Sequence, residues 1–176
     1  MPLLRSAPVT TNTDVYATDF FAWCLTTAHA VRTGQWDEID LEALAEELES
    51  LGRSQKRELE SRLEVLVMHL LKWQAQPGLR VDSHSWYDTI LEQRSQLHRL
   101  LRDNPSLRPQ VPALLEEVYP TARQRAYGHI EPRVQAPGLL APRGNVDWPE
   151  GSSQALPLTC PWTDVQILDT NFWPSP

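Results

Sequence analysis

The sequence is poor in cysteine and holds no long apolar run. Its two cysteines, Cys24 and Cys160, lie far apart and form no metal-type pair, so we expect two free thiols. No apolar run approaches the roughly 20 residues that cross a bilayer, and the first residues lack a secretory pattern. These absences predict a soluble protein with no membrane partner, located in the cytoplasm, where thiols stay reduced.

Basic residues are the minority charge. Sixteen Lys and Arg stand against 23 Asp and Glu, a formal net charge of −7, whereas non-specific nucleic-acid binding relies on clustered basic residues. A nucleic-acid partner is therefore not expected, although a local basic patch remains possible. The basic residues in mid-chain are interleaved with acidic ones, which is typical of a solvated, ion-paired helix surface: Arg53, Lys56, Arg57, Arg62, Arg94, Arg99 and Arg102.

Motifs that carry chemistry are missing as well. The sequence has no Gly-x-Ser-x-Gly elbow and no phosphate-binding glycine loop, and no Glu stands three residues before a histidine, as a di-metal helical bundle would require. The acidic run Glu46, Glu47 and Glu49 fits a solvated face better than a metal site. We therefore expect no catalytic residues, no metal and no cofactor, and favour a protein that is not an enzyme.

What the sequence does contain is helical periodicity. Leucines and other apolar residues recur at helical spacing from Leu41 to Trp73, after an N-cap at Asp40 and before Pro77. The stripe keeps its phase across Gly52, which predicts one long amphipathic helix with a bend at Gly52 at most. The i, i+4 pairs of Glu49 with Arg53 and of Glu58 with Arg62 support it.

Shorter helices are expected on both sides of the long one. One starts at Thr18 or Asp19 and ends at Gly34, and another runs from about residue 83 to 103. A further helix follows Ser106, and Pro120 should kink or split it. The sequence thus predicts an all-α helical bundle, a single domain over residues 15–176. A flexible tail (1–14), an extended Pro-rich segment (132–161) and a short helix at 164–168 with a capping box complete it.

Several polar side chains fall on the predicted buried faces. Gln55, Arg62 and His69 lie near the stripe of the long helix, and Gln93 lies between Ile90 and Leu97 of the next one. A buried Arg62 needs a carboxylate such as Glu58 or Glu92. We favour a structural polar network. The alternative is a pocket between the two helices that binds an anion or other small ligand, lined by Arg62, His69, Trp73, Trp86 and Gln93.

Short blocks of characteristic residues are spaced along the sequence: residues 19–23, 40–52, 57–63, 69–74, Ser85-Trp86, Thr89-Ile90, 92–94, 160–163 and 166–168. Through these blocks the sequence resembles a bacterial family catalogued as domain of unknown function 29. The resemblance covers nearly the whole chain and implies an all-α domain, but no activity, substrate or catalytic residue. The sequence departs from the family pattern at Pro120 and in the Pro-rich stretch.

The function that these observations favour is a non-catalytic protein-interaction module. Its aromatic and polar residues fit rigid helix packing, and an exposed apolar edge at Val67 or Leu71 would support an unidentified protein partner or a homodimer. The alternative is a small-anion or small-ligand-binding protein that uses the Arg62 cluster. An interaction module predicts an exposed apolar strip, whereas ligand binding predicts a closed pocket at Arg62.

Overall fold

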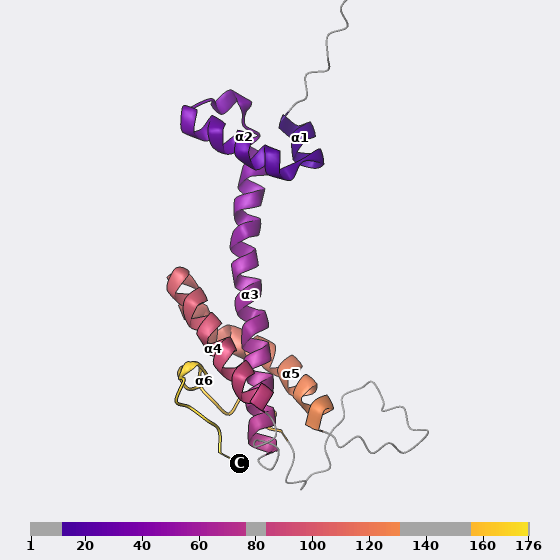
Figure 1. The fold of residues 1–176 in the computed structure, drawn as a ribbon, viewed down its shortest axis with the longest axis vertical. Helices are drawn as coiled ribbons and strands as arrows, with labels where there is room; N and C mark the ends of the chain where they lie inside the picture. Colours follow the sequence, from indigo (N-terminus) through magenta and orange to yellow (C-terminus); the bar gives the residue numbers. More distant parts are fainter. Residues whose placement is uncertain (1–11, 77–83, 131–155, 176) are drawn as a thin grey trace, which may run out of the picture. The chain divides into compact units, whose positions relative to one another are not determined.

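The fold is all-helical, as the sequence predicts. The computed structural model describes residues 12–76, 84–130 and 156–175, which contain helices and no strand (Figure 1). They divide between two compact units, residues 1–53 and 54–176, which are described separately. The single domain over residues 15–176 stays a prediction. Across these described ranges, no helix combines the length and apolar character that a membrane span requires.

The described part of unit 1, the unit of residues 1–53, contains three short helical elements and the first turns of a long one. These elements are α1 (Asn12–Thr18), α2 (Phe20–Thr33), the 3-10 helix η1 (Trp36–Glu38) and the start of α3 (Leu41–Ala75). As predicted, Asp19 caps α2 by accepting a hydrogen bond from the Ala22 N–H. Gly34 ends it with φ of 72°, a conformation that favours glycine. Helix α1 was not predicted, and it begins within the predicted flexible tail. Residues 1–11 of that tail lie outside the described residues.

The long helix α3 is confirmed as one element. Asp40 caps it by accepting the Ala43 N–H at 3.0 Å, and the helix continues through Gly52 to Ala75. A Cβ atom at Gly52 would meet nothing within 4 Å. The predicted ion pairs along the helix also form, Arg53–Glu49 at 3.0 Å and Arg62–Glu58 at 2.8 Å.

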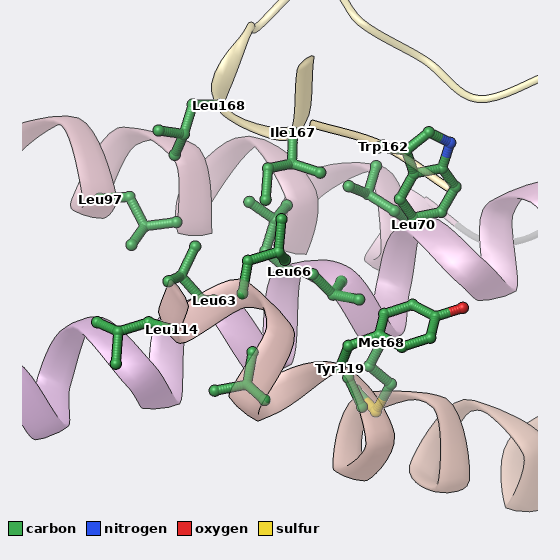
Figure 2. Packing of buried hydrophobic residues seen from close by; sticks show 14 of the residues in the cluster. Leu63, Leu66, Met68, Leu70, Leu97, Leu114, Tyr119, Trp162, Ile167 and Leu168 are labelled. Atoms are coloured by element: carbon green, nitrogen blue, oxygen red, sulfur yellow. The ribbon is translucent and has the colours of Figure 1, made fainter. Parts of the chain in front are cut away.

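Unit 2, the unit of residues 54–176, has its core where four segments meet. They are the remainder of α3, α4 (His84–Asp103), α5 (Val111–Ile130) and the C-terminal segment with α6 (Asp164–Leu168); the 3-10 helix η3 (Pro105–Gln110) joins α4 to α5. The sequence signals at Asn104-Pro105 therefore mark the end of α4 as predicted. Figure 2 shows how the buried side chains interlock between these segments, among them Leu63, Leu66, Leu70, Leu97, Leu114, Tyr119, Ile167 and Leu168.

The predicted split at Pro120 does not occur. α5 runs without a break from Val111 to Ile130, with Pro120 exposed. Proline in a helix removes one hydrogen bond and costs roughly 3 kcal/mol. Val118, Tyr119 and Ala122, next to it in sequence, are all buried in the core and hold the helix together. Tertiary packing thus overrides the local signal.

Two side chains of α5 bind the C-terminal segment by donating hydrogen bonds to backbone carbonyls of that segment. Tyr119 donates its hydroxyl to the Pro157 carbonyl at 2.7 Å, and Arg123 donates Nε–H to the Leu156 carbonyl at 3.1 Å. Burial raises the pKa of Tyr119 to about 12, so the hydroxyl keeps its proton. The predicted capping box of Thr163 and Gln166 starts α6. Of the predicted Pro-rich segment, residues 132–155 lie outside the described ones.

Candidate functional site

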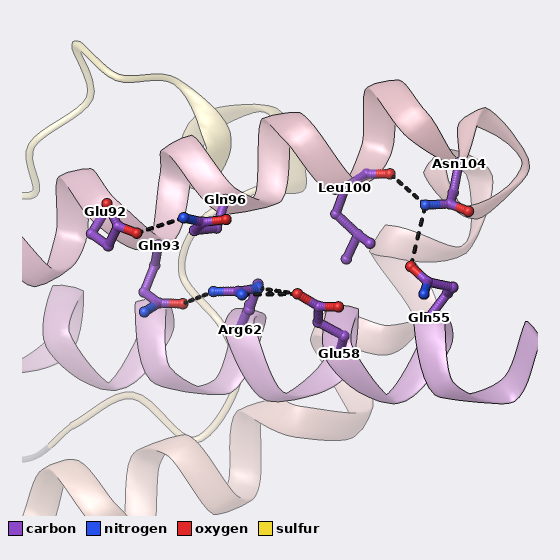
Figure 3. A network of polar contacts seen from close by, with 8 residues as sticks. All are labelled: Gln55, Glu58, Arg62, Glu92, Gln93, Gln96, Leu100 and Asn104. Carbon is purple, nitrogen blue, oxygen red and sulfur yellow. Dashed lines mark hydrogen bonds and ion pairs between the residues drawn. The ribbon is translucent and has the colours of Figure 1, made fainter. Parts of the chain in front are cut away.

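The structure brings together two of the five residues predicted to bind a ligand, Arg62 and Gln93. The Arg62 guanidinium donates to Glu58 at 2.8 Å and to the Gln93 side-chain oxygen at 3.4 Å, joining α3 to α4 (Figure 3). Glu58 is therefore the carboxylate partner, whereas Glu92 accepts a hydrogen bond from Gln96. The Arg62 side chain is 26% exposed, less buried than the helical wheel suggested. Its charge is already paired within the protein.

A second polar bridge joins α3 to Asn104, the residue that follows α4. Asn104 donates to the Gln55 side-chain oxygen at 3.4 Å and to the Leu100 carbonyl at 3.1 Å (Figure 3). An open pocket of about 210 Å³ adjoins it, and its lining includes none of the five predicted residues. Glu58, Arg99 and Asp103 contribute charges of both signs to that lining. The polar contacts along α3 and α4 fit the structural network that we favoured.

His69 and Trp86 occupy a different region, around Lys72. The Lys72 ammonium lies 4.4 Å from the centre of the Trp86 ring, a cation–π contact. Lys72 is only 6% exposed, and burial lowers its pKa. His69 Nδ1 lies 2.8 Å from the Val65 carbonyl within α3, a geometry that suits the tautomer with the proton on Nδ1. Lys72 was not among the predicted site residues.

Trp73, the fifth predicted residue, belongs to an aromatic cluster with the C-terminal segment. Its ring centre lies 4.8 Å from that of Trp173, and Tyr87 stacks on Trp173 at 4.9 Å with 8° between the planes. Phe172 and Trp173 also pack against the buried core of unit 2. The five residues are thus distributed over three sets of contacts: the Arg62 network, the Lys72 surroundings and this cluster. A shared ligand pocket for them stays a prediction.

The stability of unit 2 should fall with acidification because of His69. Burial, reinforced by the charges of Lys72, His129 and Arg125, lowers the pKa of His69 below its ordinary 6.5. As pH falls through about 6.5, the unfolded chain takes up the proton before the folded chain does, which favours unfolding. We expect the loss of melting temperature between pH 7 and pH 5 to be smaller in His69→Gln than in the wild type. His98→Gln, at an exposed position of α4, is the control; equal pH dependence in all three proteins would contradict the prediction.

Arg94 is a second buried charge that was not predicted from the sequence. It was assigned to a solvated surface, but it is 0% exposed. Its Nε–H donates to the Ile167 carbonyl at 2.9 Å and its Nη2 to the Phe172 carbonyl at 2.7 Å, and the guanidinium lies 5.3 Å from the Trp173 ring centre. Burial lowers its pKa, while the Asp169 charge opposes this shift. The signal was available, because Arg94 lies four residues after Ile90 and three before Leu97, within the apolar stripe of α4.

The exposed apolar edge lies elsewhere than predicted. Val67 and Leu71 are both 0% exposed, because they contribute to the core of unit 2. In unit 1, by contrast, α3 exposes Leu41 (59%), Leu48 (62%) and Leu51 (61%). With the half-buried Leu44, they follow a 3-4-3 spacing along one helix face. We call these four residues the leucine stripe. Unit 1 exposes further large apolar residues on α2 and η1: Phe20, Phe21, Leu25, Val31 and Trp36.

The described part of the chain contains no group of three or more His, Cys, Asp or Glu side chains placed to hold a metal ion. Both cysteines are free thiols. Burial raises the pKa of Cys160, which opposes the formation of a reactive thiolate.

Comparison with known proteins gives a family and no activity. The model of the family described as "Domain of unknown function DUF29" matches residues 15–173. The chain belongs to this family. The DUF29 match covers both units and confirms the resemblance seen in the sequence. No curated protein and no solved structure matches the chain, so the comparisons transfer no substrate or partner to this DUF29 member.

Proposed function

We propose that the chain is a non-catalytic protein-interaction module that binds an amphipathic helix of a partner protein along the leucine stripe. The observation that carries the proposal is the exposure of Leu41, Leu48 and Leu51 on one face of α3. Isolated exposed leucines are ordinary, but a row at 3-4-3 spacing is the pattern through which helices pack against each other. A partner helix with its own apolar stripe fits this row.

Charge favours a different protein over a second copy as the occupant. Residues 1–53 contain nine acidic and three basic residues, a formal charge of −6 out of −7 for the whole chain. Two copies that meet through unit 1 would bring these charges together, which opposes association. We further propose the cytoplasm as the compartment, which the free thiols of Cys24 and Cys160 support.

The alternative of anion binding at Arg62 has weaker support. The guanidinium already donates to Glu58 and Gln93, and the pocket beside the network also contains the carboxylates of Glu58 and Asp103. An incoming anion would meet these negative charges and would have to displace Glu58. The geometry thus favours a role for Arg62 in joining α3 to α4.

Site-specific crosslinking in the native cell tests the interaction. A photo-crosslinking amino acid replaces Leu48 in one protein and Leu158, an exposed leucine outside unit 1, in a matched control. We expect one partner protein to crosslink at position 48 and not at 158, and to be lost when Leu41→Ser and Leu51→Ser are added. The same products at both positions, or none at position 48, would overturn the proposal.

A further inference from the structure

The flanks of the leucine stripe are chemically different from each other. In heptad notation Leu41 and Leu48 take position a, and Leu44 and Leu51 take position d. Asp40 and Glu47 then fall at g on one flank, whereas Ala45 and Gly52 fall at e on the other. One flank is therefore acidic and the other carries almost no side chain.

The carboxylates of the acidic flank are held in place by hydrogen bonds within unit 1, Asp40 by the Ala43 N–H and Glu47 by a tyrosine of α1. Glu47 uses Oε1 to accept the Tyr16 hydroxyl at 2.6 Å, which fixes the carboxylate against α1. This hydrogen bond, followed by burial and then by the charge of Glu47, raises the pKa of Tyr16, so the tyrosine remains the donor. The carboxylate is thereby held beside the stripe, with less side-chain entropy to lose on binding.

The surface of α3 beyond the two flanks is also acidic. Glu42 and Glu49 at position b and Glu46 at position f are exposed, and Arg53, also at f, is paired with Glu49. On the small flank, nothing lies within 4 Å of a Cβ at Gly52, and Ala45 is exposed. A partner helix can thus approach closely on this side, while its opposite edge faces Asp40 and Glu47.

From this arrangement we infer that the partner helix is basic, with lysine or arginine along the edge that meets Asp40 and Glu47. The inference rests on the proposed function and specifies its partner. Positive side chains on that edge would pair with the flank carboxylates, and the negative field of unit 1 would attract a basic helix and repel an acidic one. A helix that is apolar along one face and basic at its edges is the chemistry that the stripe fits.

Two synthetic helical peptides test the effect of the partner's charge independently of its apolar stripe. Both carry leucine at every a and d position; one has lysine and the other glutamate at every e and g position, so that like charges keep each peptide from pairing with itself. At low salt we expect the full chain to bind the lysine helix at least about tenfold more tightly than the glutamate helix. At about 0.5 M salt the preference should shrink, because exposed charges are screened.

Substitutions in the chain test whether the peptide binds at the leucine stripe. Leu48→Ser with Leu51→Ser should abolish binding of the lysine helix, whereas the control Leu158→Ser should not change it. Glu47→Gln removes a charge from the acidic flank, keeps an acceptor for the Tyr16 hydroxyl and leaves the leucines intact. We expect this change to weaken the binding of the lysine helix by about two- to fivefold and not to weaken the binding of the glutamate helix.

The outcomes distinguish the inference from the proposed function. Leucine-dependent binding without preference for lysine would overturn the basic partner and leave the stripe as a helix-binding surface. Loss of both, with neither helix bound at the stripe, would overturn the proposed function itself. Sedimentation of the chain alone provides a separate check. A dimer that the Leu48→Ser and Leu51→Ser changes dissociate would identify a second copy as the occupant and overturn both.

Discussion

Leu66→Ala is expected to lower the free energy of unfolding of unit 2 by about 3 kcal/mol. Leu66 is 0% exposed in the core shown in Figure 2, so its truncation removes buried apolar surface and leaves a cavity. The same change at Leu48, which is 62% exposed on the same helix, should alter stability by less than about 0.5 kcal/mol. Urea denaturation of the two variants measures both values.

The pair also bears on the role of the leucine stripe. If Leu48→Ala proved as costly as Leu66→Ala, Leu48 would be a core residue of the free protein and could not form a free docking surface. If both changes had little effect, the core around Leu63, Leu66 and Ile167 would be wrongly assigned.

Arg94→Met should destabilise unit 2 by about 2 kcal/mol and loosen the C-terminal segment. The change leaves the Ile167 and Phe172 carbonyls without their donor, at roughly 1–3 kcal/mol for each buried group. Removal of a buried guanidinium offsets part of this loss, because desolvation of the charge is unfavourable. Urea denaturation measures the total, and amide hydrogen exchange measures the protection of residues 163–173.

Arg102→Met is the matched control, because the Arg102 side chain is 72% exposed on the same helix. It should leave both the stability and the hydrogen exchange near wild-type values. An Arg94→Met protein with wild-type protection in residues 163–173 would show that the two hydrogen bonds do not hold the segment.

The helix caps and the ion pair within α3 could be predicted from the sequence because the interacting residues lie only a few positions apart. Asp19, Gly34 and Thr163 were identified as caps, since a cap bonds to backbone within its own helix turn. The length of α3 followed in the same way from its in-phase stripe. Of the polar network, Arg62 and its carboxylate Glu58 could be named because they are four residues apart.

Long-range packing was not readable to the same degree. Arg94 donates hydrogen bonds to Ile167 and Phe172, which follow it by 73 and 78 positions in the chain. The residues around Arg94 do not indicate these distant partners. Val67 and Leu71 were predicted to lie at an exposed edge of α3, because a single apolar stripe suggests that only one face of the helix is buried. The second half of α3 is covered by α4, α5 and the C-terminal segment, so the buried surface widens there. Leu41, Leu48 and Leu51 belong to the same stripe but are exposed, because the burial of a stripe depends on the segments that pack against it.

The attachment of the C-terminal segment also bears on how the protein folds during synthesis. Arg94 leaves the ribosome long before Ile167 and Phe172, the residues whose carbonyls it needs. Until then α3, α4 and α5 can associate, but the guanidinium has no buried acceptor and the surface under Ile167 and Leu168 stays open. Contacts of such large sequence separation form late and slowly. During synthesis the helical core of unit 2 therefore passes through an incomplete state that exposes this apolar surface.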